Sequence, residues 1–394
     1  MDDFHARLMR RFRRQQAFAA ASSPLSARLL GLVADWLAAG DEDPLAAWLV
    51  RAAAGRASFD VPLLLMAGVH RAVLAGDAEA AELSRYYPTV NGHRAWSDDM
   101  LAVVFRQTVC DLRSQLATFL RSATVQTNET SRGLCWLLPV HYFGWQGIHL
   151  VDLGASAGLN LVADYRSYRL VAADTGADLC RLGHGGDPLL IRCEGRFISP
   201  QTNNMPILLS RSGCDLAPIF LRTPQDEYSL SAFIWGDQPD RLVMLRRGIV
   251  ALHQAAQSSA PVQLYGVDLP DALSRFLEEY ITPLGEAPVV IYNTYLATYL
   301  HDKGTSLRAH LDAWARRRRE PVLWVQWEPL RGQQQPPEFG WVGWTADLWQ
   351  GGRHWHGHLA WAHPHGTRIQ WLPDLQRFVH DHRHSIFARS RLAF

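Results

Sequence analysis

The spacing of hydrophobic and polar positions changes near residue 123 of this 394-residue chain. Before that point apolar residues recur every three or four positions, for example at Leu101, Phe105 and Leu112, as in helices that bury one face. Pro24 and Pro44 each follow a residue type that caps helices. The pattern predicts an all-helical domain over residues 1–122, which we expect to cover a ligand pocket as a lid.

Beyond residue 123, short apolar runs alternate with segments of helical spacing. Five of these runs have the length of a buried strand: residues 148–153, 207–216, 262–268, 288–295 and 321–328. Strands that alternate with helices indicate a parallel sheet. Residues 123–394 are therefore predicted to form an α/β domain.

Two additions to this sheet are predicted. The β-runs at residues 165–174 and 188–197 flank a loop rich in Gly and Asp and indicate a β-hairpin insertion near residues 165–205. Close to the C-terminus three more runs predict antiparallel strands that close the sheet: residues 340–349, 357–363 and 367–372.

Residues 148–161 contain the motif around which this domain is organised. An apolar run ends at Asp152, and Gly154, Ser156 and Gly158 follow before helix-forming sequence. This order predicts strand, tight turn and helix, where α/β enzymes bind ligands. One interpretation is the nucleotide loop of class I S-adenosylmethionine (SAM) methyltransferases, with Ser156 in place of a glycine. The other is the nucleophile elbow of an α/β-hydrolase, with Ser156 as nucleophile.

Acidic residues at strand ends extend the nucleotide interpretation. Asp215, followed by Leu216, ends the second core strand, where a carboxylate accepts hydrogen bonds from ribose hydroxyls. The usual spacing from the glycine loop favours Asp174 instead. We choose Asp215, since the hairpin insertion explains the longer spacing, and Asp174 stays the alternative. Asp268 ends the third strand and is expected to meet the adenine amino group.

Polar side chains crowd together in residues 124–132, just before an apolar helical segment. One such residue is enough to cap a helix. The surplus indicates that Gln126, Thr127 and Asn128 point into the ligand site, because amides and hydroxyls suit the amino-acid end of a zwitterionic ligand. A simple helix cap is the alternative.

Composition narrows the choice of partners. The formal net charge is +1 at pH 7, so neither nucleic acid nor a membrane is expected as the main partner. Five cysteines form no Cys-x-x-Cys pair and indicate no disulfide framework. His354, His356 and His358 share one face of a predicted strand, but no companion carboxylate or cysteine supports a metal site. We expect a cytoplasmic protein, since no targeting signal or bilayer-spanning run is recognisable.

Several longer motifs occur in order along the chain: Ser23-Pro24-Leu25, Tyr86-Tyr87-Pro88, residues 125–129, residues 153–160, Gly213-Cys214-Asp215-Leu216, Asp237-Gln238-Pro239 and residues 362–366. Together they resemble the bacterial family catalogued as domain of unknown function 2332, whose core is similar to class I SAM-dependent methyltransferases. The resemblance implies a Rossmann-like α/β core and SAM as cofactor.

The same resemblance suggests roles at the reacting end. It implies that Asn293 and Tyr295, at the end of the fourth strand, are catalytic, with His365 as a base. The expected reaction is methyl transfer to a small-molecule acceptor. Two alternatives stay open: a SAM lyase or cyclase that releases methylthioadenosine, and hydrolysis by Ser156. The sequence predicts neither the acceptor nor the oligomeric state.

Overall fold

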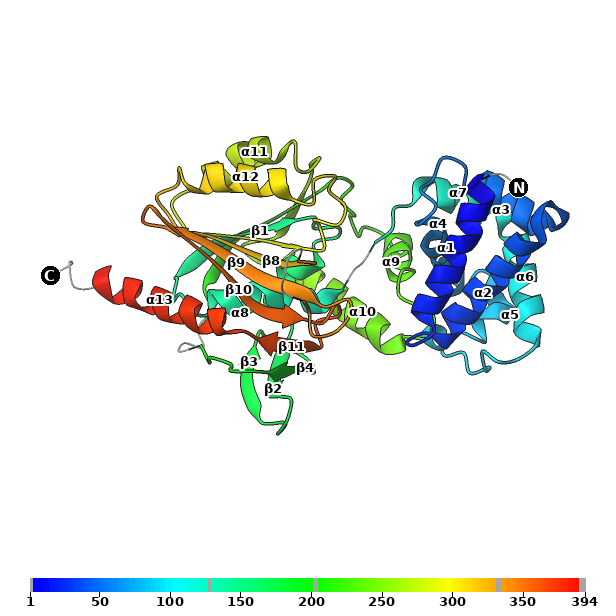
Figure 1. Ribbon diagram of the computed structural model, residues 1–394, viewed down its shortest axis with the longest axis horizontal. Helices are drawn as coiled ribbons and strands as arrows, with labels where there is room; N and C mark the ends of the chain where they lie inside the picture. Colours follow the sequence, from blue (N-terminus) through cyan, green and yellow to red (C-terminus); the bar gives the residue numbers. More distant parts are fainter. Residues whose placement is uncertain (1–2, 127–128, 201–204, 331–334, 390–394) are drawn as a thin grey trace. The chain divides into compact units, whose positions relative to one another are not determined.

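The computed structural model describes residues 3–126, 129–200, 205–330 and 335–389 (Figure 1). Contacts divide the chain into two compact units, Met1–Asn128 with Phe220–Arg246, and Glu129–Ile219 with Arg247–Phe394. The first unit therefore includes a segment that the sequence pattern placed in the second domain. The chain passes between the two units three times.

The first unit is built from helices. Their bounds are α1 (Asp3–Ala19), α2 (Pro24–Ala39), α3 (Pro44–Ala52), α4 (Val61–Ala75), α5 (Ala81–Ser84), α6 (Met100–Asp111), α7 (Arg113–Ser122) and α9 (Pro224–Ser231). Helix α10 (Pro239–Ala255) begins in this unit and continues into the second. The apolar faces meet in one core that includes Phe12, Leu30 and Phe105.

Asp237 connects the two segments of this unit. Its carboxylate accepts a hydrogen bond from the backbone N–H of Leu25 at 2.9 Å and another from the hydroxyl of Ser23. These donors lie at the start of α2, where backbone N–H groups have no partner within the helix. Two of the sequence motifs, residues 23–25 and 237–239, therefore meet to cap one helix.

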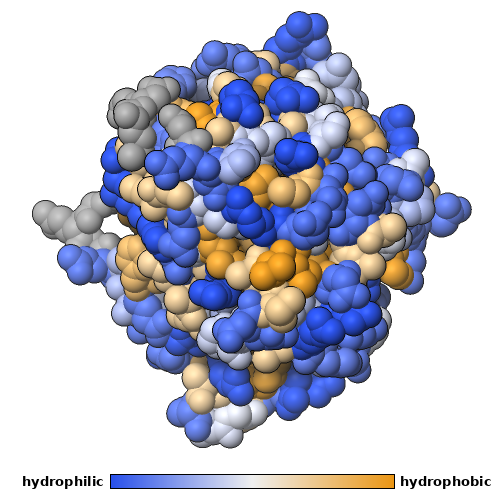
Figure 2. Space-filling view, turned by 90° about the vertical axis from the view of Figure 1, so that its right-hand side faces the viewer, coloured by the Kyte–Doolittle hydropathy of each residue, from blue (hydrophilic) through white to orange (hydrophobic). Residues whose placement is uncertain are grey.

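The surface carries no large apolar face in the view of Figure 2, where hydrophobic side chains form small groups among polar ones. Large apolar side chains of the helical unit that are at least half exposed are Phe18, Phe59, Trp96, Met100 and Val103. No single helix among the described residues is long and apolar enough to cross a membrane. One helix pair, residues 61–75 with 78–84, has together the length and apolar composition of a membrane span, but the two helices are bent by 108° relative to one another.

The described part of the second unit contains an 11-stranded sheet with the order β3-β2-β4-β11-β10-β9-β8-β7-β1-β5-β6. The strand bounds are β1 (Gly147–Leu153), β2 (Tyr168–Ala172), β3 (Asp178–Leu182), β4 (Leu189–Glu194), β5 (Ile207–Asp215), β6 (Val262–Gly266), β7 (Val289–Thr294), β8 (Val322–Glu328), β9 (Val342–Gln350), β10 (Arg353–Ala362) and β11 (Arg368–Trp371). All five predicted core runs are strands of this sheet.

Five neighbouring strands run in parallel: β6, β5, β1, β7 and β8. The chain starts in the middle with β1, adds β5 and β6 on one side and then returns to add β7 and β8 on the other. The strand order therefore reverses between β1 and β7. In open α/β sheets this reversal leaves a crevice at the carboxyl ends of the strands, where ligands bind.

Two sequence predictions about the rest of the sheet need correction. A hairpin does lie within residues 165–205, but it joins β2 to β3. The runs at residues 165–174 and 188–197 contain β2 and β4, which pair in parallel. Strand β3 was missed because its exposed and buried positions do not alternate. The antiparallel strands β9, β10 and β11 do not close the sheet; they lie inside it, because β11 pairs in parallel with β4.

Helices cover both faces of the sheet (Figure 1). On one face α8 (Leu134–Val140) and α13 (Pro373–Arg389) pack on residues such as Leu150 and Val325. On the other face α11 (Leu273–Phe276) and α12 (Thr305–Ala315) pack on Val151, Ile291 and Trp324. Because side chains alternate between the faces of a strand, each central strand contributes to both cores.

Candidate functional site

The turn after β1 carries three residues in left-handed conformations. Gly154, Ser156 and Gly158 have φ angles of 84°, 51° and 73°, which glycine adopts easily and serine rarely. The backbone N–H groups of Gly154 and Ala155 donate to the carbonyl of Cys214 on β5 at 2.8 and 2.9 Å. The turn is thereby fixed against β5, beside the point where the strand order reverses.

Packing within the protein explains why both glycines are needed. A Cβ atom at Gly154 would lie 3.2 Å from a methyl carbon of Leu296, and one at Gly158 would lie 3.0 Å from a methyl carbon of Val262. These are tight contacts for a Cβ atom. The turn therefore closely approaches side chains from β6 and from the loop after β7.

The element after this turn is the 3₁₀-helix η5 (Leu159–Tyr165), with a non-helical φ of −113° at Val162, instead of the expected α-helix. Side-chain N–H groups donate to backbone carbonyls that would accept N–H groups of the next turn in an α-helix. Trp136 Nε1 donates to the carbonyl of Asn160 at 2.8 Å, and Arg211 Nε donates to that of Leu161 at 3.1 Å. The helix prediction failed because these contacts come from distant parts of the chain.

The three predicted acids differ in exposure. Asp152 is buried and accepts a hydrogen bond from the Tyr292 hydroxyl at 2.7 Å, which links β1 to β7. Burial raises the pKa of this carboxyl to about 7. Asp215 accepts hydrogen bonds from the backbone N–H groups of Ser156 at 2.9 Å and Ala217 at 3.0 Å. Asp268 is exposed just after β6.

The sheet order separates Asp174 from the glycine turn. Asp174 lies in the turn between β2 and β3, where its carboxylate accepts from the N–H of Thr175 at 2.8 Å. Strands β4, β11, β10, β9, β8 and β7 lie between β2 and β1. Asp215 ends β5, the direct neighbour of β1, and Leu216 beside it is 72% exposed. Of the two candidates for a ribose contact, Asp215 is the one beside the turn.

Glu328, the last residue of β8, fixes the loop after β7. Its carboxylate accepts hydrogen bonds from Asn293 Nδ2 at 2.6 Å and from the N–H groups of Leu296 and Ala297 at 2.7 and 3.2 Å. Burial raises the pKa of Glu328 to about 7 although these donors lower it. Asn293 is fully buried, and its Oδ1 accepts from Trp324 Nε1 at 2.7 Å, so Asn293 orients Glu328.

Tyr295 lies in the loop after β7, which Glu328 fixes, and has a left-handed φ of 60°. The guanidinium carbon of Arg132 lies 4.1 Å from the centroid of its ring, within the range of a cation–π contact. The Tyr295 hydroxyl is buried and has no hydrogen-bond partner among the described residues. A buried polar atom without a partner is a candidate for contact with a ligand.

His365, in the turn between β10 and β11, is held by residues 129–132, the segment that includes Arg132. Its Nδ1 lies 2.8 Å from a carboxylate oxygen of Glu129, which is buried. The turn is fixed further by Ser131, whose hydroxyl donates to the carbonyl of His365 at 2.6 Å, and by Arg132 Nε, which donates to that of Pro364 at 3.2 Å. We call Glu129, Arg132, Asn293, Tyr295, Glu328 and His365 the strand-end cluster.

This cluster unites the three predicted catalytic residues but adds others. Asn293, Tyr295 and His365 all belong to it through shared partners, whereas Glu129 and Arg132 were not among the predicted site residues. Their signal was two charges next to an otherwise apolar segment. Thr127 and Asn128 lie outside the described residues, and Gln126 belongs to the helical unit.

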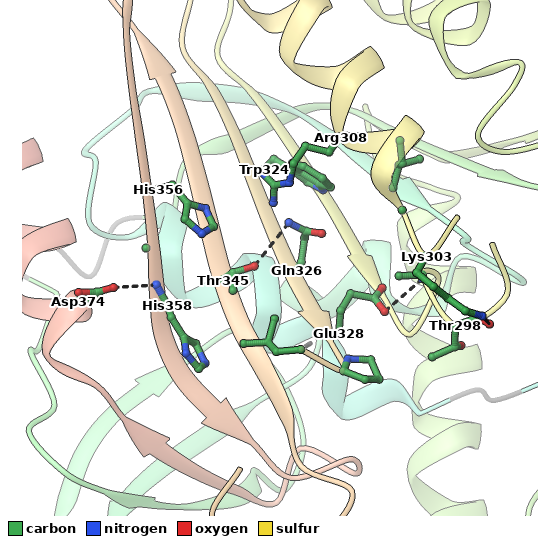
Figure 3. A pocket seen from close by; sticks show the side chains of 16 residues that line it. Thr298, Lys303, Arg308, Trp324, Gln326, Glu328, Thr345, His356, His358 and Asp374 are labelled. Carbon is green, nitrogen blue, oxygen red and sulfur yellow. Dashed lines mark hydrogen bonds between the residues drawn. The ribbon is translucent and has the colours of Figure 1, made fainter. Parts of the chain in front are cut away.

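A cavity of about 880 Å3 opens next to Glu328, on the sheet face that α12 partly covers. We call it the sheet-face cavity. Figure 3 shows Trp324, Gln326 and Glu328 in a row along β8, with Thr345 of β9 and His356 of β10 beside them. The loop after β7 and the start of α12 form its wall.

The three alternating histidines lie near this cavity. His354 Nε2 and His356 Nδ1 lie 2.9 and 3.0 Å from the same oxygen of Asp347, and the backbone N–H of His358 donates to Asp374 at 3.0 Å. Asp347 is the carboxylate that sequence spacing did not reveal, because β9 brings it opposite His356. Within the described residues no group of three or more His, Cys, Asp or Glu side chains could hold a metal ion.

The fold and these clusters define a mixed α/β protein with a large, mostly parallel sheet and polar side chains gathered where its strands end. The chain belongs to the family described as "Uncharacterized protein conserved in bacteria (DUF2332)", which it matches over residues 9–371. No curated protein and no solved structure matches the chain. The family membership indicated by the sequence motifs is confirmed, and the family description states no activity.

Proposed function

We propose that the chain is a SAM-dependent enzyme that transfers a methyl group to a small-molecule acceptor. The observation that carries this proposal is the position of the glycine turn. If the five parallel strands are numbered in chain order, the sheet reads 3-2-1-4-5, the order of the nucleotide-binding Rossmann fold. The turn lies where that order reverses, which is where such folds bind their cofactor.

Side chains next to the turn suit a nucleoside. The Asp215 carboxylate uses one lone pair on each oxygen for Ser156 and Ala217, and further lone pairs stay free to accept from ribose hydroxyls. Leu216 offers an exposed apolar surface to adenine, and Asp268 can accept from the adenine amino group. In this proposal Asp152 supports the turn through Tyr292 and does not touch the cofactor.

The strand-end cluster would hold the acceptor. SAM supplies an electrophilic methyl carbon next to a sulfonium. When bound, its sulfur would accept the carbon–sulfur electrons as the methyl group leaves. Nε2 of His365 would take the proton of the acceptor O–H or N–H group that attacks the methyl carbon. Glu129 orients the His365 ring through Nδ1, as carboxylates do in other general-base histidines. The Tyr295 hydroxyl donates to the acceptor and fixes its orientation.

Ser156 supports a second candidate, hydrolysis. Its left-handed φ of 51° resembles the strained turn of a nucleophile elbow. A fluorophosphonate probe labels an activated serine. Labelling at Ser156, lost in Ser156→Ala, together with no binding of SAM, would support the hydrolase.

The proposal is tested by product analysis. Purified protein is incubated with SAM alone, with SAM and a dialysed cell extract, and with SAM and the same extract after the small molecules of the cell are added back. Products are identified by mass spectrometry. We expect S-adenosylhomocysteine only when the small molecules are present. Enzyme-dependent methylthioadenosine without any acceptor would assign a lyase or cyclase reaction instead, and unchanged SAM in every mixture would contradict a SAM-dependent enzyme.

A further inference from the structure

We propose that the sheet-face cavity binds a small hydroxylated carboxylic acid, whose carboxylate lies at the end formed by Arg308 and His356. The volume of about 880 Å3 falls within the range of small-molecule sites. The binding claim does not depend on SAM. Only the role of this ligand as the acceptor rests on the proposed function.

The middle of the cavity has unused hydrogen-bonding capacity. Gln326 and Thr345 line it, and each is more than nine-tenths buried. Their side chains contact one another at 3.5 Å, which is longer than an ordinary hydrogen bond. An amide and a hydroxyl that are buried with so weak a bond are costly unless another partner satisfies them. Hydroxyl groups of a ligand can both donate to and accept from this pair.

One end of the cavity presents a fixed cation. Asp347 is fully buried, and one of its oxygens accepts from Arg308 at 2.9 Å and lies 3.0 Å from His356 Nδ1. The Arg308 guanidinium also lies 4.7 Å from the centroid of the Trp324 ring. Both Arg308 and His356 line the cavity, and their side chains are 43% and 49% exposed. Asp347 thus fixes both side chains, and the guanidinium N–H groups of Arg308 that Asp347 does not use are accessible from the cavity.

This end can bind a carboxylate, and the nearby start of α12 is already occupied by a side chain of the protein. A guanidinium held in one plane matches the two oxygens of a carboxylate. Phosphates bind at helix N-termini, but here Asp302 occupies the start of α12, because its carboxylate accepts from the N–H groups of Gly304 at 3.0 Å and Ser306 at 2.6 Å. Lys303, also at this wall, donates to the carbonyl of Thr298 at 3.0 Å.

The opposite end of the cavity reaches the strand-end cluster. Glu328 belongs to both, because it lines the cavity and accepts from Asn293. His356 on β10 lies opposite Asp347 on β9, and Asp347 lies opposite Trp324 on β8. Gln326 and Glu328 follow Trp324 along β8 and point to the same face of the sheet. A ligand bound at Arg308 and His356 therefore extends along β8 toward Glu328. Its hydroxyl end would arrive beside Glu328.

The test measures binding of gluconate and of sorbitol, which share an open six-carbon hydroxylated chain and differ in the carboxylate, by saturation-transfer NMR and calorimetry without SAM. We expect gluconate to bind at least about tenfold more tightly than sorbitol, a difference of about 1.4 kcal/mol. Arg308→Gln should abolish this preference. Thr345→Val, which keeps the shape and leaves Asp347 paired, should weaken gluconate severalfold. His93→Ala, at an exposed histidine of the helical unit, should change nothing.

Three outcomes would overturn the inference: no binding of gluconate at millimolar concentration, equal affinity for the two compounds, or an unchanged affinity in both Arg308→Gln and Thr345→Val. Because Thr345→Val leaves the ion pair of Asp347 intact, a fall in its affinity for gluconate does not come from the loss of that pair. Melting temperatures of all variants are recorded in parallel to detect unfolding. If gluconate binds and SAM does not, the cavity is a ligand site and the proposed transfer is wrong.

Discussion

Arg132 covers the ring of Tyr295, with its guanidinium carbon 4.1 Å from the ring centroid. Both residues are fixed by backbone contacts: Arg132 Nε donates to the carbonyl of Pro364 at 3.2 Å, and the N–H of Tyr295 donates to that of Trp327 at 2.9 Å. The contact therefore joins the segment before α8, the loop after β7 and the turn after β10. Three parts of the chain that are distant in sequence meet at one pair of side chains.

Tyr295→Phe should separate function from stability. The Tyr295 hydroxyl has no partner within the described residues, so its removal should change the free energy of unfolding by less than about 1 kcal/mol. If the hydroxyl orients the acceptor, turnover of SAM should fall by roughly tenfold or more. Urea unfolding and product analysis measure the two effects. A clear loss of stability with full turnover would place the hydroxyl in the fold alone.

Asp152→Asn should change how stability depends on pH. The pKa of Asp152 is raised from 3.8 to about 7 by burial, so the folded state binds a proton that the unfolded state has lost between these values. Stability from this group is therefore greatest below about pH 4 and falls as pH rises to about 7. The total loss is on the order of 4 to 5 kcal/mol, at about 1.4 kcal/mol per pKa unit.

Asparagine cannot ionise, and its amide oxygen still accepts from Tyr292. The stability of Asp152→Asn relative to the unchanged protein should therefore increase from pH 4.5 to pH 8, as measured by urea unfolding. Asp271→Asn, at an exposed position, serves as the control with no such trend. A flat difference for Asp152→Asn across this range would mean that the carboxyl ionises normally in the folded protein.

Gly158→Ala should destabilise the protein whether or not a ligand binds. The residue has a φ of 73°, and a Cβ atom would lie 3.0 Å from Val262, so we expect a cost of roughly 1 to 3 kcal/mol. Gly266→Ala is the matched control, because a Cβ there meets nothing within 4 Å. Equal melting temperatures of the two variants would contradict the packing role of Gly158.

Sequence reasoning succeeded where the signal was local. The apolar runs that became β1, β7 and β8 are short and continuous, as expected for strands buried on both faces. The glycines of the turn were found for the same reason, since a left-handed backbone demands a particular residue at that position. Their neighbours, Leu296 and Val262, were not found, because only the tertiary fold brings them close.

Contacts between residues that are far apart in the sequence could not be predicted. Asp347 and His356 form a pair only because β9 and β10 run antiparallel in one register, and Glu129 meets His365 across 236 positions. The sheet position of β9, β10 and β11 depends on the pairing of β11 with β4, which no hydrophobic pattern in either strand specifies. Edge and interior strands were therefore confused, whereas the strands themselves were located.

The central claim, a nucleoside site at the glycine turn, is tested most directly by calorimetric titration with S-adenosylhomocysteine. We expect saturable binding to the unchanged protein and a loss of about tenfold or more in Asp215→Asn, which keeps an acceptor for the Ser156 N–H but removes the charge that meets ribose. Asp174→Asn, at the distant β2–β3 turn, should bind normally. Absence of heat and of any thermal shift at millimolar ligand, or equal affinity in Asp215→Asn, would contradict the account.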